Sequence, residues 1–287
     1  MEKVGINKNE KEGVKMKKDV VVLFGAGSIG IAIARRISLG KYILLADKSK
    51  ENLEMQSRIL SEAGYENSTI IVDISSKKSI LEVVEKAKSI GKIRHLIQAA
   101  GVSPSQASIE TIIKVDLYGT AVILEEFGKV IEPYGTGIVI SSQSGHRLPA
   151  LTIEENKLLA TTPVEKLLDL PIVKEIDDTL RAYQISKRGN VLRVASESTK
   201  WGKKGARINS ISPGIIMTPL ALDELNGPRG EMYRNMLDKT SGKRAGISDE
   251  IAALAELMMG ENGGFINGSD FLVDGGVTAH YWYGDLQ

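Results

Sequence analysis

The sequence predicts an α/β protein built on one doubly wound parallel sheet of about seven strands, with helices on both faces. Short apolar runs alternate with helical stretches along most of its 287 residues, and a glycine-rich loop follows the first run. This regular alternation implies right-handed βαβ crossovers and a single large domain. Polar or small residues stand where the runs end, and ligands of such sheets bind beyond the carboxyl ends of the strands.

The composition narrows the possible function classes. The chain is 42% hydrophobic and 25% charged, as globular proteins are, and its net charge of +1 gives no reason to expect nucleic acid or an anionic membrane as a partner. It has no cysteine, which excludes disulfides and thiolate metal sites. No run of 18 apolar residues occurs, and no His/Asp/Glu group has metal-ligand spacing. We therefore expect a cytoplasmic protein without a metal.

The first segments predict a dinucleotide site. Residues 1–18 are polar and lysine-rich, so we expect a tail, or an arm on a neighbouring subunit, before a domain over 19–287. The apolar strand Val20–Phe24 leads through a G-x-G-x-x-G loop into a helix over 31–39. In that context the loop backbone and the helix N-terminus can hold a pyrophosphate. The loop residues expected to contact it are Gly25, Gly27, Ser28, Ile29 and Gly30.

The next two strands predict the nucleoside contacts. The strand Tyr42–Ala46 ends at Asp47, whose carboxylate can accept hydrogen bonds from ribose hydroxyls and would repel a 2′-phosphate. NAD(H) is therefore favoured over NADP(H), although Lys48 could instead receive that phosphate. A strand over 69–73 ends at Asp73. We expect Asp73 and Ile74, at this strand end, to hydrogen-bond the adenine amino group.

The remaining elements of the sheet follow in order. We expect strands over 95–99, 137–141, 206–211 and 268–274, and helices over 77–89, 109–131, 179–201 and 248–259. The fourth strand runs into Ala99, Ala100 and Gly101, whose small side chains suit a surface beneath a cofactor. The fifth strand delivers Ser142 to the same edge of the sheet.

Two segments interrupt this pattern. Residues 146–178 are charged and proline-bearing, with short helices over 152–159 and 163–168, and are too short to bury a core of their own. We interpret them as an insertion. His146 and Arg147 at its start could reach a substrate anion, but we expect them to be solvated loop residues. Residues 219–240 are amphipathic and predict a mobile flap over the substrate.

Tyr183 and Lys187 are the residues around which the chemistry is organised. Their spacing of four places both side chains on one helix face, where the ammonium can lower the pKa of the phenol. A tyrosine so tuned is a general acid/base for interconverting an alcohol and a ketone.

Taken in order, these motifs resemble the short-chain dehydrogenase/reductase family, whose domain is of the Rossmann type. The matching pieces are the glycine loop, Asp73, Gln98-Ala-Ala-Gly101, Ser142, Tyr183-x-x-x-Lys187, Pro213-Gly214 with Thr218, and Val273-Asp-Gly-Gly276. The resemblance implies that Tyr183 exchanges the proton, that Lys187 holds the nicotinamide ribose, and that Ser142 stabilises the substrate oxygen. It places Pro213, Gly214, Ile215 and Thr218 at the nicotinamide carboxamide.

Three features depart from the family pattern. The glycine loop is shorter than usual, so its phosphate contacts should differ. Asp116 stands where the family has an asparagine that kinks the long helix and organises a water near the lysine. Asp116 either has a catalytic role, by holding that water or pairing with Lys187, or is a structural substitute. Lastly, 41 positions separate Ser142 from Tyr183, an unusually long gap that the insertion must close.

The resemblance implies an NAD(H)-dependent oxidoreductase that interconverts a secondary alcohol and a ketone, working as a homodimer or homotetramer. Family members with long insertions here include bacterial 3α-hydroxysteroid dehydrogenases, so a steroid or bile acid is one candidate substrate. A cofactor-binding sensor without catalysis is an alternative that only Asp116 favours. A nucleotide-sugar epimerase or dehydratase is disfavoured, because the chain ends soon after Gly276.

Overall fold

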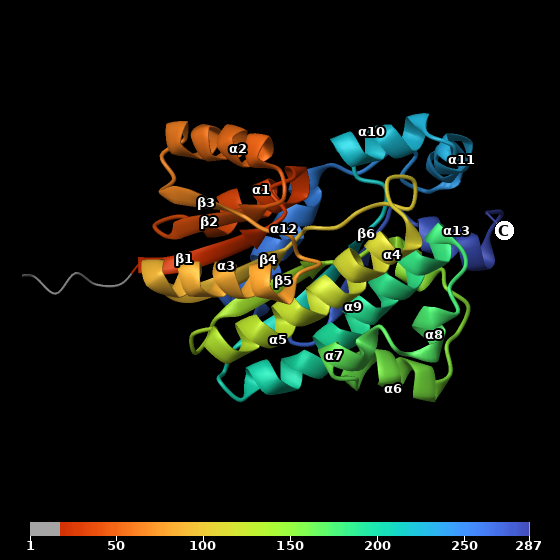
Figure 1. Cartoon of the computed structure of the whole chain (residues 1–287). Coiled ribbons are helices and arrows are strands. Elements are labelled where there is room, and N and C mark those ends of the chain that lie inside the picture. Colours follow the sequence, from red (N-terminus) through yellow and green to blue (C-terminus); the bar gives the residue numbers. More distant parts are fainter. Residues whose placement is uncertain (1–17, 287) are drawn as a thin grey trace, which may run out of the picture.

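A seven-stranded sheet runs through the centre of the molecule, of which the computed structural model describes residues 18–286 (Figure 1). All strands pair in parallel, in the order β3-β2-β1-β4-β5-β6-β7. They are β1 (Lys18–Phe24), β2 (Tyr42–Asp47), β3 (Asn67–Ile71), β4 (Gly91–Gln98), β5 (Thr136–Ile140), β6 (Arg207–Pro213) and β7 (Asp270–Val273). The predicted fold class is confirmed. The predicted tail, apart from Lys18, lies outside the described residues.

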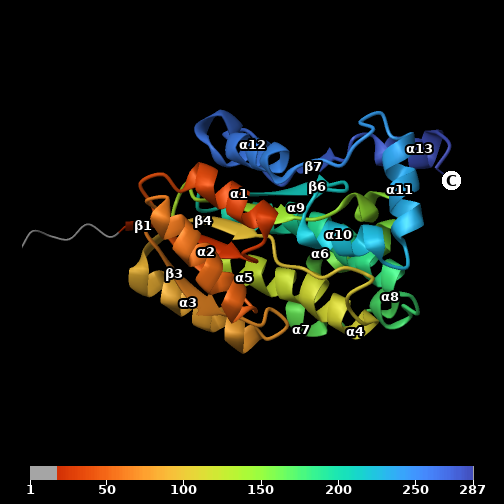
Figure 2. The same ribbon diagram turned by 90° about the horizontal axis from the view of Figure 1, so that it is seen from above.

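Alternate residues of each strand bury against opposite helical layers. Val20 and Val22 of β1 belong to one hydrophobic cluster, and Val21 and Leu23 belong to the other. Helices α3 (Lys77–Ile90), α5 (Thr120–Val130) and α9 (Thr179–Gly202) cover the first face, and α1 (Ser28–Ile37), α2 (Lys50–Glu62) and α12 (Ser248–Met259) cover the second. Figure 2 shows α1 and α12 on one side of the sheet and α3 and α5 on the other. This double burial explains why the strands are continuous apolar runs.

Helix α2 is the main element for which the sequence analysis predicted nothing. Ser49 caps its N-terminus, with its hydroxyl accepting a hydrogen bond from the Asn52 N–H at 3.1 Å. Only Leu53 and Leu60 of this helix are fully buried. Two buried positions in a charged segment leave little periodicity to recognise.

The single helix predicted over 109–131 is interrupted in the middle. A π-helical segment, Ile113–Gly119, lies between α4 (Ile109–Ile112) and α5. One extra residue in a helical turn changes which side chains face inward, and such segments often occur at functional sites. Here Asp116 lies inside the π-helical segment and is fully buried.

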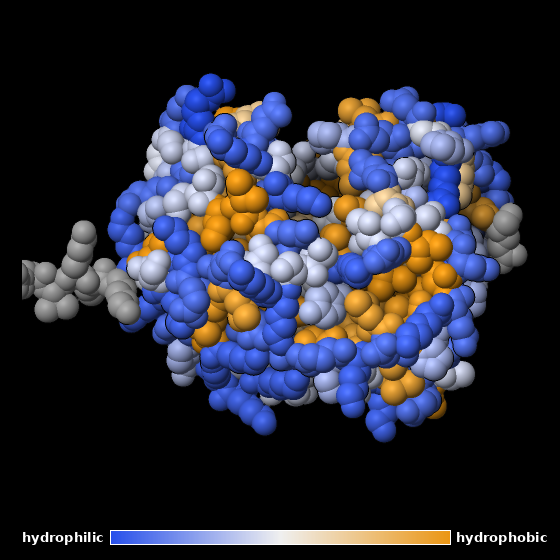
Figure 3. Space-filling view, viewed as in Figure 1, coloured by the Kyte–Doolittle hydropathy of each residue, from blue (hydrophilic) through white to orange (hydrophobic). Residues whose placement is uncertain are grey.

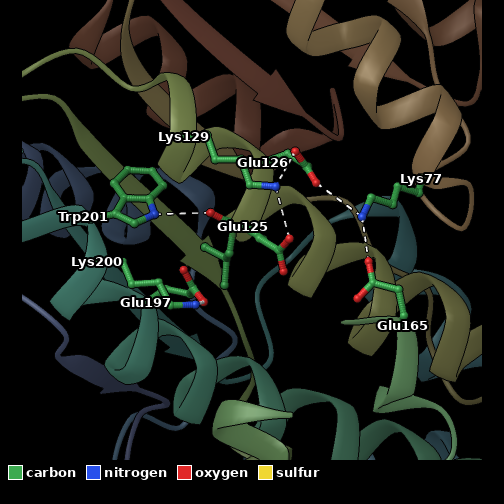
Figure 4. A network of polar contacts seen from close by, with 9 residues as sticks. Lys77, Glu125, Glu126, Lys129, Glu165, Glu197, Lys200 and Trp201 are labelled. Carbon is green, nitrogen blue, oxygen red and sulfur yellow. Dashed lines mark hydrogen bonds and ion pairs between the residues drawn. The ribbon is translucent and has the colours of Figure 1, made fainter. Parts of the chain in front are cut away.

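Residues 147–178 fold onto the α9 face of the main core. They form α6 (Ile153–Thr161), α7 (Val164–Leu167) and α8 (Pro171–Lys174), with Leu159 and Leu167 fully buried in the core that α3, α5 and α9 share. Polar contacts add to this packing (Figure 4). Lys77 of α3 lies 2.8 Å from Glu165 of α7 and 3.5 Å from Glu126 of α5.

The C-terminal third builds the rim above the carboxyl ends of the strands. The segment predicted as a flap contains α10 (Pro219–Asn226) and α11 (Gly230–Lys239), and the aromatic ending forms α13 (Val277–Tyr283). Two short 3₁₀ turns, η2 (Gln143–His146) and η3 (Glu261–Gly263), complete the elements. Within the described part of the chain, no helix combines the length and apolar character needed to cross a membrane.

Candidate active site

A cleft of about 470 Å³ opens at the carboxyl edge of the sheet. The glycine loop and α2 line one wall, and α10 lines the other (Figure 3 shows the hollow between α2 and α10). The predicted site residues that line it are Gly27, Ser28, Ile29, Gly30, Ala99, Gly101, Ser142, Tyr183, Lys187, Pro213, Gly214 and Thr218. The cleft therefore brings together two motifs that are distant in the sequence, the glycine loop and the Tyr-x-x-x-Lys helix.

The glycine loop has the form that a pyrophosphate requires. Gly25 has a φ of +85°, and a Cβ there would lie 2.5 Å from the Ala100 nitrogen. A Cβ on Gly27 would meet nothing within 4 Å, so the backbone at this position is open to approach. Gly27 also begins α1 without a side-chain cap, leaving the first N–H groups of the helix for an anion. These features fit a dinucleotide phosphate group.

Asp47 braces this loop. Its Oδ2 accepts a hydrogen bond from the Ala26 N–H at 2.8 Å, and its Oδ1 accepts one from the Ser49 N–H at 2.9 Å. The Asn52 amide donates to the Ala26 carbonyl at 3.0 Å. The Asn52 amide also donates to the Asp47 Oδ2 at 3.5 Å. Asp47 thus stands directly behind the loop, and its Oδ1 keeps a lone pair for a ribose hydroxyl.

Several predicted site residues do not line the cleft. They are Gly25, Asp47, Asp73, Ile74, Ala100, Asp116 and Ile215. Asp73 accepts hydrogen bonds from the Ser75 hydroxyl and N–H, which lower the pKa of its carboxyl. The cleft residues that sequence analysis missed are Ala26, Asn52, Met55, Gln56, Val102, Ile140, Ser141 and Ile216, whereas Pro219, Leu220 and Ala221, which also line the cleft, belong to the segment predicted as a flap over the substrate. The three on α2 were missed together with their helix.

Backbone contacts bring Tyr183 and Lys187 to the end of β5 despite the 41-position gap. The Ser141 hydroxyl donates to the Lys187 carbonyl at 2.8 Å, which fixes α9 against the strand end. The Lys187 Nζ lies 5.3 Å from the centre of the Tyr183 ring and donates to the Ile140 carbonyl at 3.5 Å. The Ser142 Oγ accepts the Ser144 N–H at 3.1 Å, so its own proton remains available for another acceptor.

Asp116 is held next to this group by the π-helical segment. Its Oδ1 accepts the Val102 N–H at 3.0 Å, while its Oδ2 is buried without a partner among the described residues. Burial raises the pKa of the Asp116 carboxyl to about 6, against the opposing charge of Lys187 and the hydrogen bond from Val102. An aspartate in this position is thus poised to change protonation near neutral pH.

The phenol of Tyr183 behaves differently from the expectation. Desolvation raises its pKa above the ordinary value of 10.0, and the negative charge of Asp116 adds to the rise. The Lys187 ammonium and the Ser142 hydroxyl lower that pKa, as the spacing predicted, but do not outweigh burial. The lowering that the spacing predicted for Lys187 is thus present, and the cost of burying the phenolate outweighs it.

The far wall of the cleft is fastened by polar contacts. The Thr218 hydroxyl caps α10 by accepting the Ala221 N–H at 3.2 Å. Glu224, almost fully buried, accepts hydrogen bonds from the Ser105 N–H at 3.3 Å and the Ser105 hydroxyl at 2.8 Å. The end of α10 is thus joined to the loop that follows β4.

The surroundings of His146, at the end of η2, and of Arg147, just after it, also differ from the prediction. Arg147 is only 6% exposed, and the His146 Nε2 lies 2.8 Å from the Asp270 Oδ2. The prediction that both are solvated loop residues is wrong. The prediction failed because α11 and α13, which come much later in the chain, cover this segment in the folded protein.

Comparisons with known proteins agree with this geometry. The family model described as short chain dehydrogenase matches residues 18–152, and that described as Enoyl-(Acyl carrier protein) reductase matches residues 173–278. The chain is 39% identical over 270 residues to the short-chain dehydrogenase/reductase bsc3 of Alternaria brassicicola, covering 92% of this chain and 97% of that one. It is 26% identical to a 7alpha-hydroxysteroid dehydrogenase of Bacteroides fragilis, with 92% and 95% covered. The solved structure of levodione reductase superposes with a TM-score of 0.74 at 22% identity, covering 92% of this chain and 99% of that one.

Proposed function

The chain belongs to the short-chain dehydrogenase/reductase family and is an NAD(P)-dependent oxidoreductase of alcohol and carbonyl groups, and we propose that it interconverts a secondary alcohol and a ketone with NAD(H). The observation that carries this proposal is that Ser142, Tyr183 and Lys187 share one cleft with the glycine loop. A nicotinamide cofactor held by that loop would therefore share its cavity with a proton-transfer group, as hydride transfer to or from a carbonyl carbon requires.

The proton steps follow from the hydrogen bonds of the site. In ketone reduction, the Tyr183 phenol donates its proton to the substrate oxygen as negative charge develops there. The Ser142 hydroxyl can donate its proton to that oxygen and stabilise the charge, because the Ser142 Oγ already accepts a hydrogen bond from the Ser144 N–H. Alcohol oxidation reverses these steps. The bound nicotinamide supplies or accepts the hydride and, when oxidised, adds positive charge that favours the phenolate.

Lys187 and Asp116 support the tyrosine in this proposal. The buried Lys187 ammonium lowers the pKa of the phenol and is free to bind ribose hydroxyls, since its one hydrogen bond, to Ile140, is long. Burial lowers the pKa of Lys187, but the negative charges of Asp116 and Tyr183 outweigh that effect and keep the ammonium charged. We assign Asp116 a positioning and proton-holding role behind the lysine.

Asp47 supports NAD(H) as the cofactor. Its carboxylate lies immediately behind the loop that would hold the pyrophosphate, where a 2′-phosphate would meet its negative charge. Lys48 is the alternative anchor for NADP(H). The residues expected at the nicotinamide end, Pro213, Gly214 and Thr218, line the opposite part of the cleft.

Relatives give a starting panel of substrates. Those named above include a hydroxysteroid dehydrogenase and levodione reductase, which suggests cyclic ketones, steroids among them, as first choices. Turnover of such ketones with NADH, and of the matching alcohols with NAD⁺, tests the proposal. Absence of turnover on a broad panel, with tight NADH binding, would contradict it. We also expect a homodimer or homotetramer in the cytoplasm, which sedimentation and fractionation would test.

A further inference from the structure

Arg147 is a buried cation that the proposed mechanism does not use. It is 6% exposed and follows η2 directly, five residues after Ser142. One terminal nitrogen donates to the Ser144 hydroxyl at 3.2 Å, and the other donates to the Met236 sulfur at 3.5 Å. The Nε has no partner, and the guanidinium carbon lies 5.7 Å from the centre of the Tyr281 ring. The guanidinium has five N–H donors, and in the described part of the chain only one hydroxyl and one thioether accept hydrogen bonds from it.

No carboxylate in residues 18–286 forms an ion pair with Arg147, because those nearby are engaged elsewhere. Asp270 accepts from the Ser210 and Ser212 hydroxyls and contacts His146. Asp274 accepts hydrogen bonds from the Gly276 N–H at 2.9 Å and the Thr278 N–H at 2.7 Å, at the N-terminus of α13. Asp274 acts on Arg147 electrostatically without contacting it as an ion pair. Because a buried charge is stabilised most by a directly contacting partner, an anion from outside the chain could occupy that place.

Arg147 is connected to the reacting groups through one residue. Ser144 donates its N–H to the Ser142 Oγ at 3.1 Å and accepts the Arg147 guanidinium on its own hydroxyl. Burial lowers the pKa of Arg147, and the negative charges of Tyr233, Tyr281, Asp274 and Tyr183 oppose this effect, in that order. The cover over Arg147 is Met236 of α11, on the segment that we expect to move with substrate. A thioether is a weak acceptor that an anion can displace.

We propose that Arg147 binds a carboxylate carried by the substrate, so that the enzyme acts on oxo acids and the corresponding hydroxy acids. This inference rests on the proposed function of the site. The planar guanidinium fork matches a carboxylate in two parallel hydrogen bonds. A single cation balances the single charge of a carboxylate, whereas a phosphate dianion would call for more than one. The ketone reacts at Ser142 and Tyr183 while the carboxylate replaces the Met236 sulfur at Arg147.

Matched acids and esters test this assignment. The probes are 4-oxopentanoate, 6-oxoheptanoate and 4-acetylbenzoate, each beside its methyl ester, with kcat/KM measured at saturating NADH and affinity measured by calorimetry on the NAD⁺ complex, in which the ketone cannot be reduced. For at least one pair we expect the acid to be preferred by about 10-fold, the factor of one charge-assisted contact. Arg147→Gln should bring that ratio close to one. Arg147→Lys should lower it less, since it keeps the charge and loses the fork.

Arg193 is the matched control. It is 4% exposed and lies on α9, where it donates to the Thr162 carbonyl of the insertion. Arg193→Gln should leave the acid-to-ester ratio unchanged, which separates recognition from the general loss of a buried arginine.

Three outcomes would overturn the inference. In the first, no acid binds more tightly than its ester. In the second, the Arg147→Gln variant binds NADH and keeps the wild-type acid-to-ester ratio. In the third, inorganic phosphate competes with the substrate more strongly than acetate does. Continued turnover of esters would leave the proposed ketone reductase function standing in each case.

Discussion

Asp116 and Lys187 meet across Gly101 at the centre of the site. A Cβ on Gly101 would lie 2.8 Å from the Asp116 Oδ1 and 3.2 Å from the Lys187 Nζ. Among the described residues, the Asp116 Oδ1 accepts from the Val102 N–H, the Lys187 Nζ donates to the Ile140 carbonyl, and the Asp116 Oδ2 is unpartnered. The π-helical segment thus places a titratable carboxyl where the family resemblance leads one to expect a neutral amide.

Asp116→Asn should shift the pH dependence of alcohol oxidation to lower pH. The negative charge of Asp116 raises the pKa of Tyr183, so its removal lowers that pKa and makes phenolate available at lower pH. The variant should oxidise alcohols several-fold faster than wild type on the acidic limb of the kcat/KM profile. Below about pH 6 the two profiles should converge, because Asp116 is then protonated in the wild-type enzyme.

The control for this comparison is Glu110→Gln, which removes an exposed carboxylate from α4, just before the π-helical segment. Its profile should match wild type. A profile for Asp116→Asn that is unchanged, or shifted to higher pH, would show that the charge of Asp116 does not reach the phenol.

Asp47→Asn should weaken discrimination against NADPH. The substitution removes the charge that a 2′-phosphate would meet, while an amide oxygen can still accept the Ala26 N–H that holds the loop. We expect the ratio of NADPH to NADH dissociation constants to fall by about 10-fold. Fluorescence titration with both cofactors measures it. If Lys48→Ala instead abolishes a pre-existing NADPH preference, the assignment of Asp47 is wrong.

His95 should make the fold sensitive to acid. Burial lowers the pKa of this imidazole to about 3, while its Nδ1 lies 2.7 Å from the Thr136 hydroxyl. The unfolded chain therefore binds a proton below pH 6.5 that the folded chain does not, and stability is lost as pH falls from 6.5 toward 3. At pH 4.5 this amounts to about 3 kcal/mol relative to pH 7.

Urea unfolding of wild type and His95→Asn at pH 7 and pH 4.5 measures that effect. The variant should lose less of its unfolding free energy on acidification than wild type does. An equal loss in both proteins would mean that other groups carry the acid sensitivity.

The parts of the fold that sequence predicted are those with strong local signals. Val20–Phe24 is recognisable because burial on both faces makes the strand continuously apolar. Gly25 and Gly30 are recognisable because any Cβ there would collide with backbone. Tyr183 and Lys187 needed only helical spacing to be placed together.

What the sequence did not predict depends on residues distant in the chain. Burial of Arg147 is due to Met236, 89 positions later, and to Tyr281 near the C-terminus. The π-helical turn at Asp116 has no local sequence signature, and Gly119 within it passes so close to the Ile74 carbonyl that a Cβ would lie 2.4 Å away. The net pKa of Tyr183 likewise depends on burial, which spacing alone does not give.

The most direct test of the account is Tyr183→Phe, assayed for NADH binding and for turnover of the best ketone in the panel. The substitution removes the proton donor and leaves the glycine loop, Asp47 and Lys187 in place. We predict an NADH dissociation constant close to that of wild type together with loss of turnover by a factor of about 100 or more. Turnover retained at the wild-type level would contradict the assignment of Tyr183 as the general acid/base.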